Sequence, residues 1–300
     1  MKAQRFVLKP KPGEIVEVRN EKEVAATLDS DNTLDGLSFT PEMFRYCGKK
    51  FRVLKSINKI FVEGIGTRSI KNTMVLEGTF CHGEAHGNCQ RMCLLLWKEA
   101  WLKRPQEKGT DSVISTDQTI SKQIIDNVPC QSASLRKATS QVISFEDFIK
   151  TYLCDERFKK WFVLKKTGAL SLWLTLKVKR YLGQKRDSAL CGFLKKTPSI
   201  PLNLRPGELI EVKNKADIVM TLDTDGKNRG LGFTPEMLKY CGQRFRILKR
   251  INKIIEEQTG QMKHTANTVI LENVTCDGSS HADCPRNCYL LWREIWLKRV

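Results

Sequence analysis

The chain contains two copies of one unit, and this internal repeat constrains its fold more than any other feature of the sequence. Residues 12–59 align without a gap to residues 206–253. After one additional residue in the second copy, NTMVLEGTFC at 72–81 matches NTVILENVTC at 267–276. Each copy therefore has to fold as a unit of roughly 100 residues, which is the size of one small domain.

The repeat and the composition between its copies predict four segments. The segment between the copies begins with a stretch rich in Ser, Thr and Gln, which is typical of a linker. Ser144 and Asp147 then form a capping-box pattern that predicts a helix, and residues 157–186 contain ten Lys or Arg and no Asp or Glu. The predicted segments are copy 1 (1–104), a linker (105–143), a basic helical connector (144–200) and copy 2 (201–300).

Within each copy, strand signals alternate with turn signals. Pro-Gly followed by EIVEV or ELIEV predicts a turn and a strand, and Thr-Pro-Glu at 40–42 and 234–236 predicts a short helix. The segments FRVLKSINKIFV and NTMVLEGTF are rich in β-branched residues and predict a long hairpin. We expect an α+β protein with two small β-rich modules in tandem, each an SH3-like barrel. We interpret the tryptophan-containing ends, LLLWKEAWLK and YLLWREIWLK, as strands whose tryptophans lie in the core.

Eight of the eleven cysteines recur in register in the two copies. Four thiolates can complete a tetrahedral zinc shell, so the spacing predicts one zinc ion in each copy. An iron–sulfur cluster is the alternative cofactor, because thiolates suit both, and buried reduced cysteines without metal are a third reading. The predicted ligands are Cys47, Cys81, Cys89 and Cys93 in copy 1, and Cys241, Cys276, Cys284 and Cys288 in copy 2.

One histidine also recurs, five residues after the second cysteine of each set. His86 and His281 are the candidate catalytic residues of this sequence. They could ligate the metal, hydrogen-bond a thiolate or transfer protons, or they could have only a structural hydrogen bond. No Ser/His/Asp order, phosphate loop or dinucleotide fingerprint is present, so enzymatic activity is left open.

The net charge of +18 favours anionic partners, namely RNA, DNA or an acidic protein. Strand alternation places basic residues on one face of the predicted hairpin, beside the tryptophans. The candidate anion-binding residues are Lys50, Arg52, Arg244, Arg246 and Arg250. The shared acids Glu99 and Glu294 precede Lys103 and Lys298 by four residues, which predicts ion pairs.

The sequence predicts no export signal and no transmembrane span. Its first residues, MKAQRFVLKPKPGE, have no apolar run, and no apolar stretch reaches the length that a bilayer requires. We therefore expect a cytoplasmic protein with reduced cysteines. Residues 157–186 could still contact a membrane surface through their basic side chains.

The motif CG-[KQ]-[KR]-FR-[VI]-LK, followed by C-[HD]-G-x2-H-x2-C-x3-C-x3-W-x-E-x-WLKR, resembles an uncharacterised bacterial protein family. Members of that family usually have one copy of the unit, and some accompany carrier-protein or secondary-metabolite systems. The resemblance covers both copies and implies an acidic phosphopantetheine carrier protein as a candidate partner.

These observations predict a tandem zinc-binding protein that binds an anionic macromolecule. The alternative is a metalloenzyme of bacterial specialised metabolism that acts on a small or carrier-protein-bound substrate.

Overall fold

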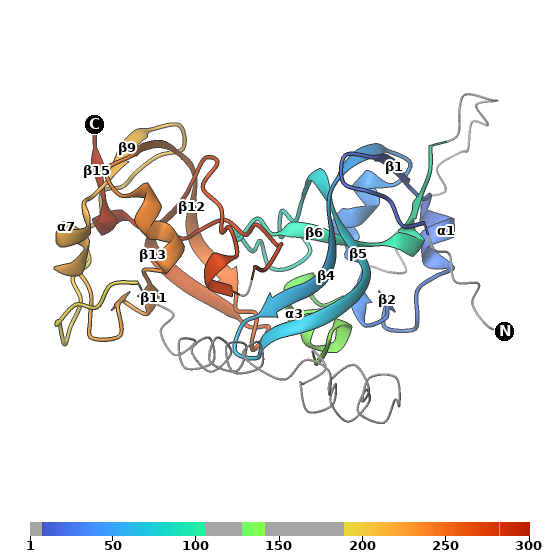
Figure 1. The fold of residues 1–300 in the computed structure, drawn as a ribbon, viewed down its shortest axis with the longest axis horizontal. Coiled ribbons are helices and arrows are strands. Elements are labelled where there is room, and N and C mark those ends of the chain that lie inside the picture. The colour runs from blue at the N-terminus through green and yellow to red at the C-terminus, as the bar shows by residue number, and fades with distance from the viewer. Residues whose placement is uncertain (1–7, 106–127, 142–188, 282) are drawn as a thin grey trace, which may run out of the picture.

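A computed structural model describes residues 8–105, 128–141, 189–281 and 283–300 of the chain (Figure 1). The described residues form mostly β-sheet with few and short helices, which confirms the predicted β-rich α+β class. The two copies form separate sheets whose strands follow the same order.

Copy 1 is a sheet in which the order β6-β5-β4-β1-β7 is antiparallel throughout. Short 3-10 helices, labelled η, precede β4 and β7. The elements are β1 (Ile15–Val18), α1 (Glu21–Ala25), β2 (Thr33–Leu34), β3 (Leu37–Ser38), η1 (Pro41–Tyr46), β4 (Lys50–Val62), β5 (Gly66–Phe80), β6 (Leu94–Lys98), η2 (Glu99–Trp101) and β7 (Leu102–Lys103).

Copy 2 repeats this arrangement in the order β14-β13-β12-β9-β15. Its elements are β9 (Leu209–Val212), α7 (Lys215–Val219), β10 (Lys227–Asn228), β11 (Leu231–Gly232), η3 (Pro235–Tyr240), β12 (Arg244–Ile255), β13 (Met262–Leu271), η4 (Ser279–His281), β14 (Trp292–Arg293), η5 (Glu294–Trp296) and β15 (Leu297–Arg299).

The tryptophans lie in the core of each copy, as predicted. Trp97, Trp101, Trp292 and Trp296 are all completely buried. In copy 1, Trp101 packs edge-to-face on Phe39, with ring centroids 5.1 Å apart. The strand interpretation of these segments is confirmed for β6 and β14, while a single 3-10 turn separates each from the final strand.

Part of the predicted linker is ordered against copy 1, which differs from the expectation for 105–143. Residues 128–141 contain α3 (Gln131–Ala138) and β8 (Ser140–Gln141), and β8 pairs with β5. Leu135 is completely buried, and the Gln131 amide donates to the carbonyls of Ser38 and Leu96. These contacts attach α3 to copy 1: Leu135 packs in the core, and the buried amide of Gln131 finds its hydrogen-bond partners on the backbone of copy 1.

The remaining linker, 106–127, and most of the predicted connector lie outside the described residues, as do the Ser144 capping box and the stretch 157–186. Within the described ranges, no helix is long and apolar enough to cross a bilayer.

The long hairpin of each copy reaches across to contact the other copy (Figure 1). The Phe61 N–H, near the end of β4, donates to the Cys284 sulfur at 3.3 Å. Reciprocally, the Ile255 N–H at the end of β12 donates to the Cys89 sulfur at 3.3 Å. Each hairpin therefore covers the cysteine loop of the other copy.

Candidate metal sites

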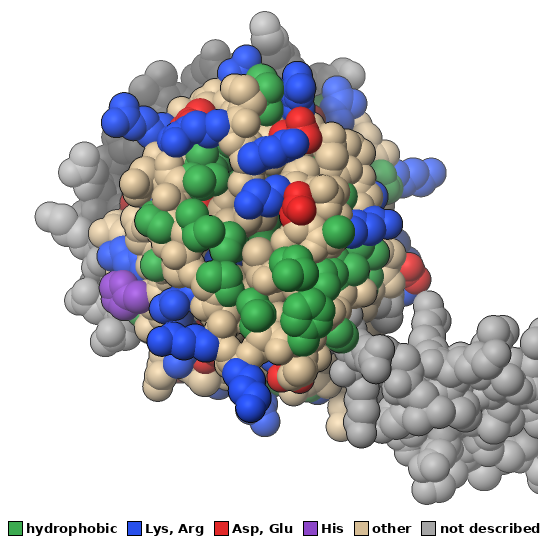
Figure 2. Space-filling model, turned by 90° about the vertical axis from the view of Figure 1, so that its left-hand side faces the viewer, with side chains coloured by type: hydrophobic (Ala, Val, Ile, Leu, Met, Phe, Trp, Pro, Cys, Tyr) green, Lys and Arg blue, Asp and Glu red, His purple; other side chains and the backbone are tan. Residues whose placement is uncertain are grey.

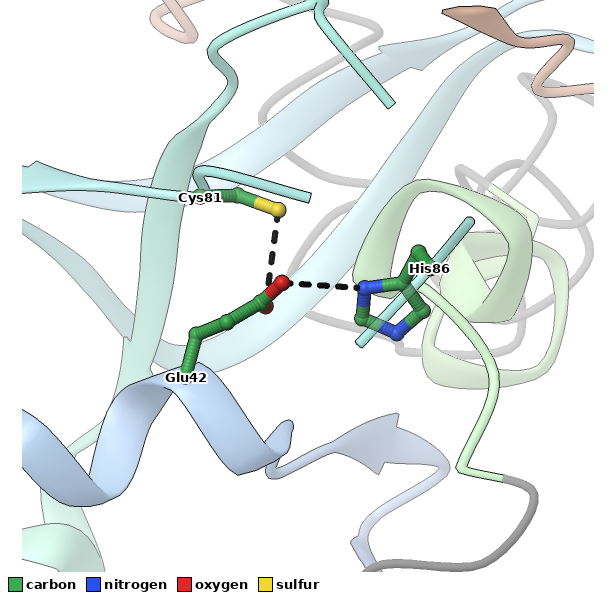
Figure 3. Close-up of side chains that lie close together, drawn as sticks. All are labelled: Glu42, Cys81 and His86. Carbon is green, nitrogen blue, oxygen red and sulfur yellow. Dashed lines mark hydrogen bonds and ion pairs between the residues drawn. The ribbon is translucent and has the colours of Figure 1, made fainter. Parts of the chain in front are cut away.

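In copy 1, a glutamate, a cysteine and a histidine from separate elements come together (Figure 3). Glu42 lies in η1, Cys81 directly follows β5, and His86 lies in the loop after Cys81. The Cys81 sulfur is 3.6 Å from Glu42 Oε2, and His86 Nδ1 is 3.5 Å from Glu42 Oε1. All three residues are buried.

Copy 2 assembles the same three residue types at the equivalent positions. His281 Nδ1 lies 3.2 Å from Glu236 Oε1 and 4.0 Å from the Cys276 sulfur. In each copy the potential ligand atoms lie within 4.8 Å of one another. The side chain of His281 is 28% exposed, against 5% for His86, so the second site is the more open one.

A glycine with positive φ determines the path of each loop that contains His86 or His281. Gly83 and Gly278 both have positive φ values, +78° and +81°, which favour glycine. Their carbonyls accept the N–H groups of His86 and His281 at 2.9 and 2.8 Å. The loop thus turns tightly and returns the imidazole toward the glutamate of η1 or η3.

The carboxylates are held in their charged form. Burial alone would raise the pKa of Glu42, but the hydrogen bond and charge of His86 outweigh it and lower that pKa. The pKa of Glu236 is lowered in the same way against its burial, by His281 and Cys276. Burial and the neighbouring Glu236 raise the pKa of the Cys276 thiol well above its usual range. A divalent cation would reverse this last effect, because it stabilises the thiolate.

The residues of the triads fit a transition-metal ion. Thiolate sulfur, imidazole nitrogen and carboxylate oxygen are all zinc ligands. His86 Nε2 and Glu236 Oε2 are buried and have no hydrogen-bond partner among the described residues, whereas His86 Nδ1 faces Glu42 Oε1 at 3.5 Å. Buried polar atoms without a partner are rare in native proteins, and a bound ion is one of the groups that could satisfy them.

The eight predicted cysteine ligands do not meet as four-thiolate groups in the described part of the chain. Cys81 and Cys276 belong to the triads, whereas Cys89 and Cys284 accept the N–H groups of the opposite hairpin. Cys47 and Cys241 follow the last residues of η1 and η3. Cys93 and Cys288 lie beside the interface between the copies. Burial, followed by the charge of Glu21, raises the pKa of Cys47 to about 12.

One cysteine outside the repeat lies at the copy 1 site. Cys130 immediately precedes α3, and its thiol is next to that of Cys81. The hydrogen bond from Cys81 lowers the pKa of Cys130 to about 6 in spite of its burial. Composition gave no signal for this residue, because it lies in the segment predicted to be a linker.

Within the described ranges, the candidate anion-binding residues have partners in the protein, with the exception of the exposed Lys50. Arg250 pairs with the fully buried Glu294 at 2.7 Å and also donates to a backbone carbonyl, so it stabilises copy 2 from within. The other three contact nearby acids or carbonyls: Arg52 with Gly13 and Glu77, Arg244 with Glu211, and Arg246 with Gly207.

Basic side chains on one face of copy 2 do not form a single patch. In Figure 2 the Lys and Arg side chains are spread over the upper and lower parts of the face, with hydrophobic side chains between them. Several lie next to Asp or Glu. Any attraction that this face exerts on an anion is therefore distributed over the surface.

The glutamates of the triads are the site residues that sequence reasoning missed. Glu42 and Glu236 occur at the same place in both copies, within the Thr-Pro-Glu helix start. An acidic residue there also suits the first turn of a helix, so the repeat alone did not mark it as a ligand.

Comparison with known proteins gives no relative for this arrangement: no family model, no curated protein and no solved structure matches the chain.

Proposed function

We propose that the protein binds two metal ions, one in each Glu/Cys/His triad, and that the ion is zinc. The observation that carries this proposal is the recurrence of the same three side chains, within 4.8 Å of one another, at equivalent positions of the two copies. Zinc is favoured because the three ligands are of mixed type, whereas iron–sulfur clusters are held mainly by thiolates. Reduced thiols suit a cytoplasmic location.

Metal analysis of the purified chain tests this proposal. We expect two zinc ions per chain and no visible chromophore in the wild type. Cys81→Ser/His86→Ala and Cys276→Ser/His281→Ala should each remove one ion, and the two double variants combined should remove both. Cys191→Ser is the matched control, since Cys191 is exposed and belongs to neither triad. A brown protein would indicate iron–sulfur clusters instead, and a double variant that retains two zinc ions would refute the assignment.

As an architecture for the two metal-binding modules, we propose that each sheet is an SH3-like barrel. The support is the strand path, in which the first strand lies between the last strand and the long first strand of the hairpin. The long strands β4 and β12 then bend at register shifts, as strands shared between two halves of a barrel do.

For the role of these modules we propose the binding of an anionic macromolecule, with RNA or an acidic carrier protein as the candidates. The support is the net charge of +18. Such binding depends on ionic strength, because a polyanion releases counterions when basic side chains replace them.

Fluorescence anisotropy with a labelled RNA oligonucleotide, and separately with an acidic phosphopantetheine carrier protein, measures this dependence. We expect the Kd to rise steeply with salt and the slope to decrease in Lys50→Gln. Arg250→Lys, which keeps the internal charge, is the control and should leave the slope unchanged. An affinity that does not vary with ionic strength would eliminate this role.

A metalloenzyme is the second candidate, and one observation favours it. A triad supplies three protein ligands, and catalytic zinc sites use three protein ligands with one open position. In such a site the ion would polarise a substrate or activate water. In the cobalt-substituted protein, added azide should change the visible spectrum if a position is open. An unchanged spectrum at saturating azide would exclude this alternative.

A further inference from the structure

Copy 1 has a structural element beside its site that the described part of copy 2 lacks. Helix α3 packs on β3, and the Gln131 side chain bonds to the backbone of Leu96 through both its oxygen and its nitrogen. This contact fixes the start of the helix. Cys130, the residue just before α3, is consequently held at the site and is only 8% exposed.

The Cys130 thiol lies beside the triad of copy 1, on the side of Cys81. It lies next to the Cys81 thiol and close to the His86 ring. Cys81, Cys93 and Cys130 line one small cavity, together with Thr40, Ser132 and Arg286. Cys81 joins this cavity to the triad, because its sulfur also lies within 4.8 Å of the His86 and Glu42 ligand atoms, and His86 Nε2 is buried there without a hydrogen-bond partner among the described residues.

The corresponding space in copy 2 is bounded differently. The ring of Phe61, from copy 1, packs on His281 with centroids 4.5 Å apart. Cys191, the one described cysteine of the second half outside the repeat, is exposed, and the adjacent Gly192 bonds to Asp223 rather than to the site. In the described residues, then, only copy 1 has an additional thiol at its triad.

We infer that Cys130 is a fourth ligand in copy 1, which makes the two metal sites unequal. This inference rests on the proposed binding of a metal by each triad. Two cysteines, a histidine and a glutamate close the coordination of the first ion, which then has a structural role. The second site, with three ligands and a partly exposed histidine, keeps the position at which a small anionic ligand or a substrate group can bind.

Cobalt substitution distinguishes the two sites without disturbing Cys130. Cys276→Ser loads only the first site, and the double variant Cys81→Ser/His86→Ala loads only the second, because Cys130 and Glu42 alone are too few ligands. Because the sulfur-to-cobalt charge-transfer band grows with each thiolate ligand, the first site should absorb about twice as strongly per cobalt as the second. Equal intensities at one cobalt per chain would overturn the inference while leaving the proposed metal binding intact.

The release of zinc to a chelator provides the second measurement. In the wild type we expect one fast and one slow phase of equal amplitude, with the slow phase assigned to copy 1. Cys130→Ser should convert the slow phase into a fast one while the chain retains two zinc ions, and Cys93→Ser should not. A slow phase that survives Cys130→Ser, or that disappears only in Cys93→Ser, would refute Cys130 as the ligand. Wild-type protein that binds no metal would refute the proposed function itself.

Discussion

At the scale of single residues, the buried Glu294 shows how the copies diverged while keeping one fold. Its carboxylate accepts the N–H groups of Leu202, Asn203 and Leu204 and pairs with Arg250. Among the residues that the structure describes, the equivalent Glu99 accepts one N–H, from Lys9, and the counterpart of Arg250 in copy 1 is a serine. The ion pairs expected with Lys298 and Lys103 are not formed, because both lysines pair with glutamates of the adjacent strand or helix.

Glu294→Ala should therefore destabilise its copy much more than Glu99→Ala does. Removing one member of a buried ion pair leaves the other charge uncompensated, and we expect a loss of about 3–5 kcal/mol in the free energy of unfolding. Glu99→Ala removes one hydrogen bond and should cost about 1 kcal/mol. Urea unfolding of the two variants, followed by tryptophan fluorescence, measures both values. Equal losses would show that Glu294 is not a central contact of copy 2.

At the scale of elements, the loops after β5 and β13 depend on a glycine that closely approaches the backbone. A Cβ atom at Gly278 would lie 2.2 Å from the Cys284 carbonyl oxygen, so an alanine forces the loop to move. Gly242 has a similar φ value of +76°, but a Cβ atom there would meet no other atom within 4 Å. An alanine at Gly242 therefore tests the cost of the left-handed backbone alone, whereas an alanine at Gly278 adds a steric clash to that cost.

Gly278→Ala should lower the stability of copy 2 and release its zinc ion, because the loop that contains His281 is displaced. Gly242→Ala should cost only about 1 kcal/mol for the left-handed conformation and should keep both ions. Zinc content and the urea midpoint are measured for each variant. Retention of two zinc ions in Gly278→Ala would show that the loop geometry is not required for the site.

The strands and the core could be predicted from the sequence, whereas the residues of the candidate metal sites could be predicted only in part. β-branched residues and the repeat were sufficient to locate the hairpins, and the paired tryptophans identified the core. The two glutamates of the triads could not be singled out from the sequence, because their nearness to the cysteine and the histidine depends on distances between η1 and the loop after β5. Cys130 was inaccessible for the same reason, since it reaches Cys81 only through the packing of α3.

At the scale of the whole molecule, the reach of each hairpin across to the other copy protects the cysteine loops. Cys89 and Cys284 are both buried, and each accepts a hydrogen bond from the other copy. No periodicity predicts such contacts, because they join residues whose sequence separation exceeds either copy.

Substitutions in the two hairpins should therefore expose cysteines in the opposite copies. Phe61→Ala should accelerate the alkylation of Cys284, and Ile255→Ala should accelerate that of Cys89, as measured by mass spectrometry after timed exposure to iodoacetamide. Each variant is the control for the other. The exposed Cys191 should react rapidly in both. If each substitution accelerated alkylation only within its own copy, the reciprocal cover of the cysteine loops would be refuted.

The reciprocal hairpins also restrict how such a gene can evolve. Recombination between the two similar halves would readily delete one of them, but the surviving half would then have an uncovered cysteine loop and an unpartnered hairpin tip. Two such shortened chains could form a dimer in which the hairpin of each covers the cysteine loop of the other. The duplicated chain thus preserves, within one polypeptide, the contacts that a pair of separate half-length chains would have to find by diffusion.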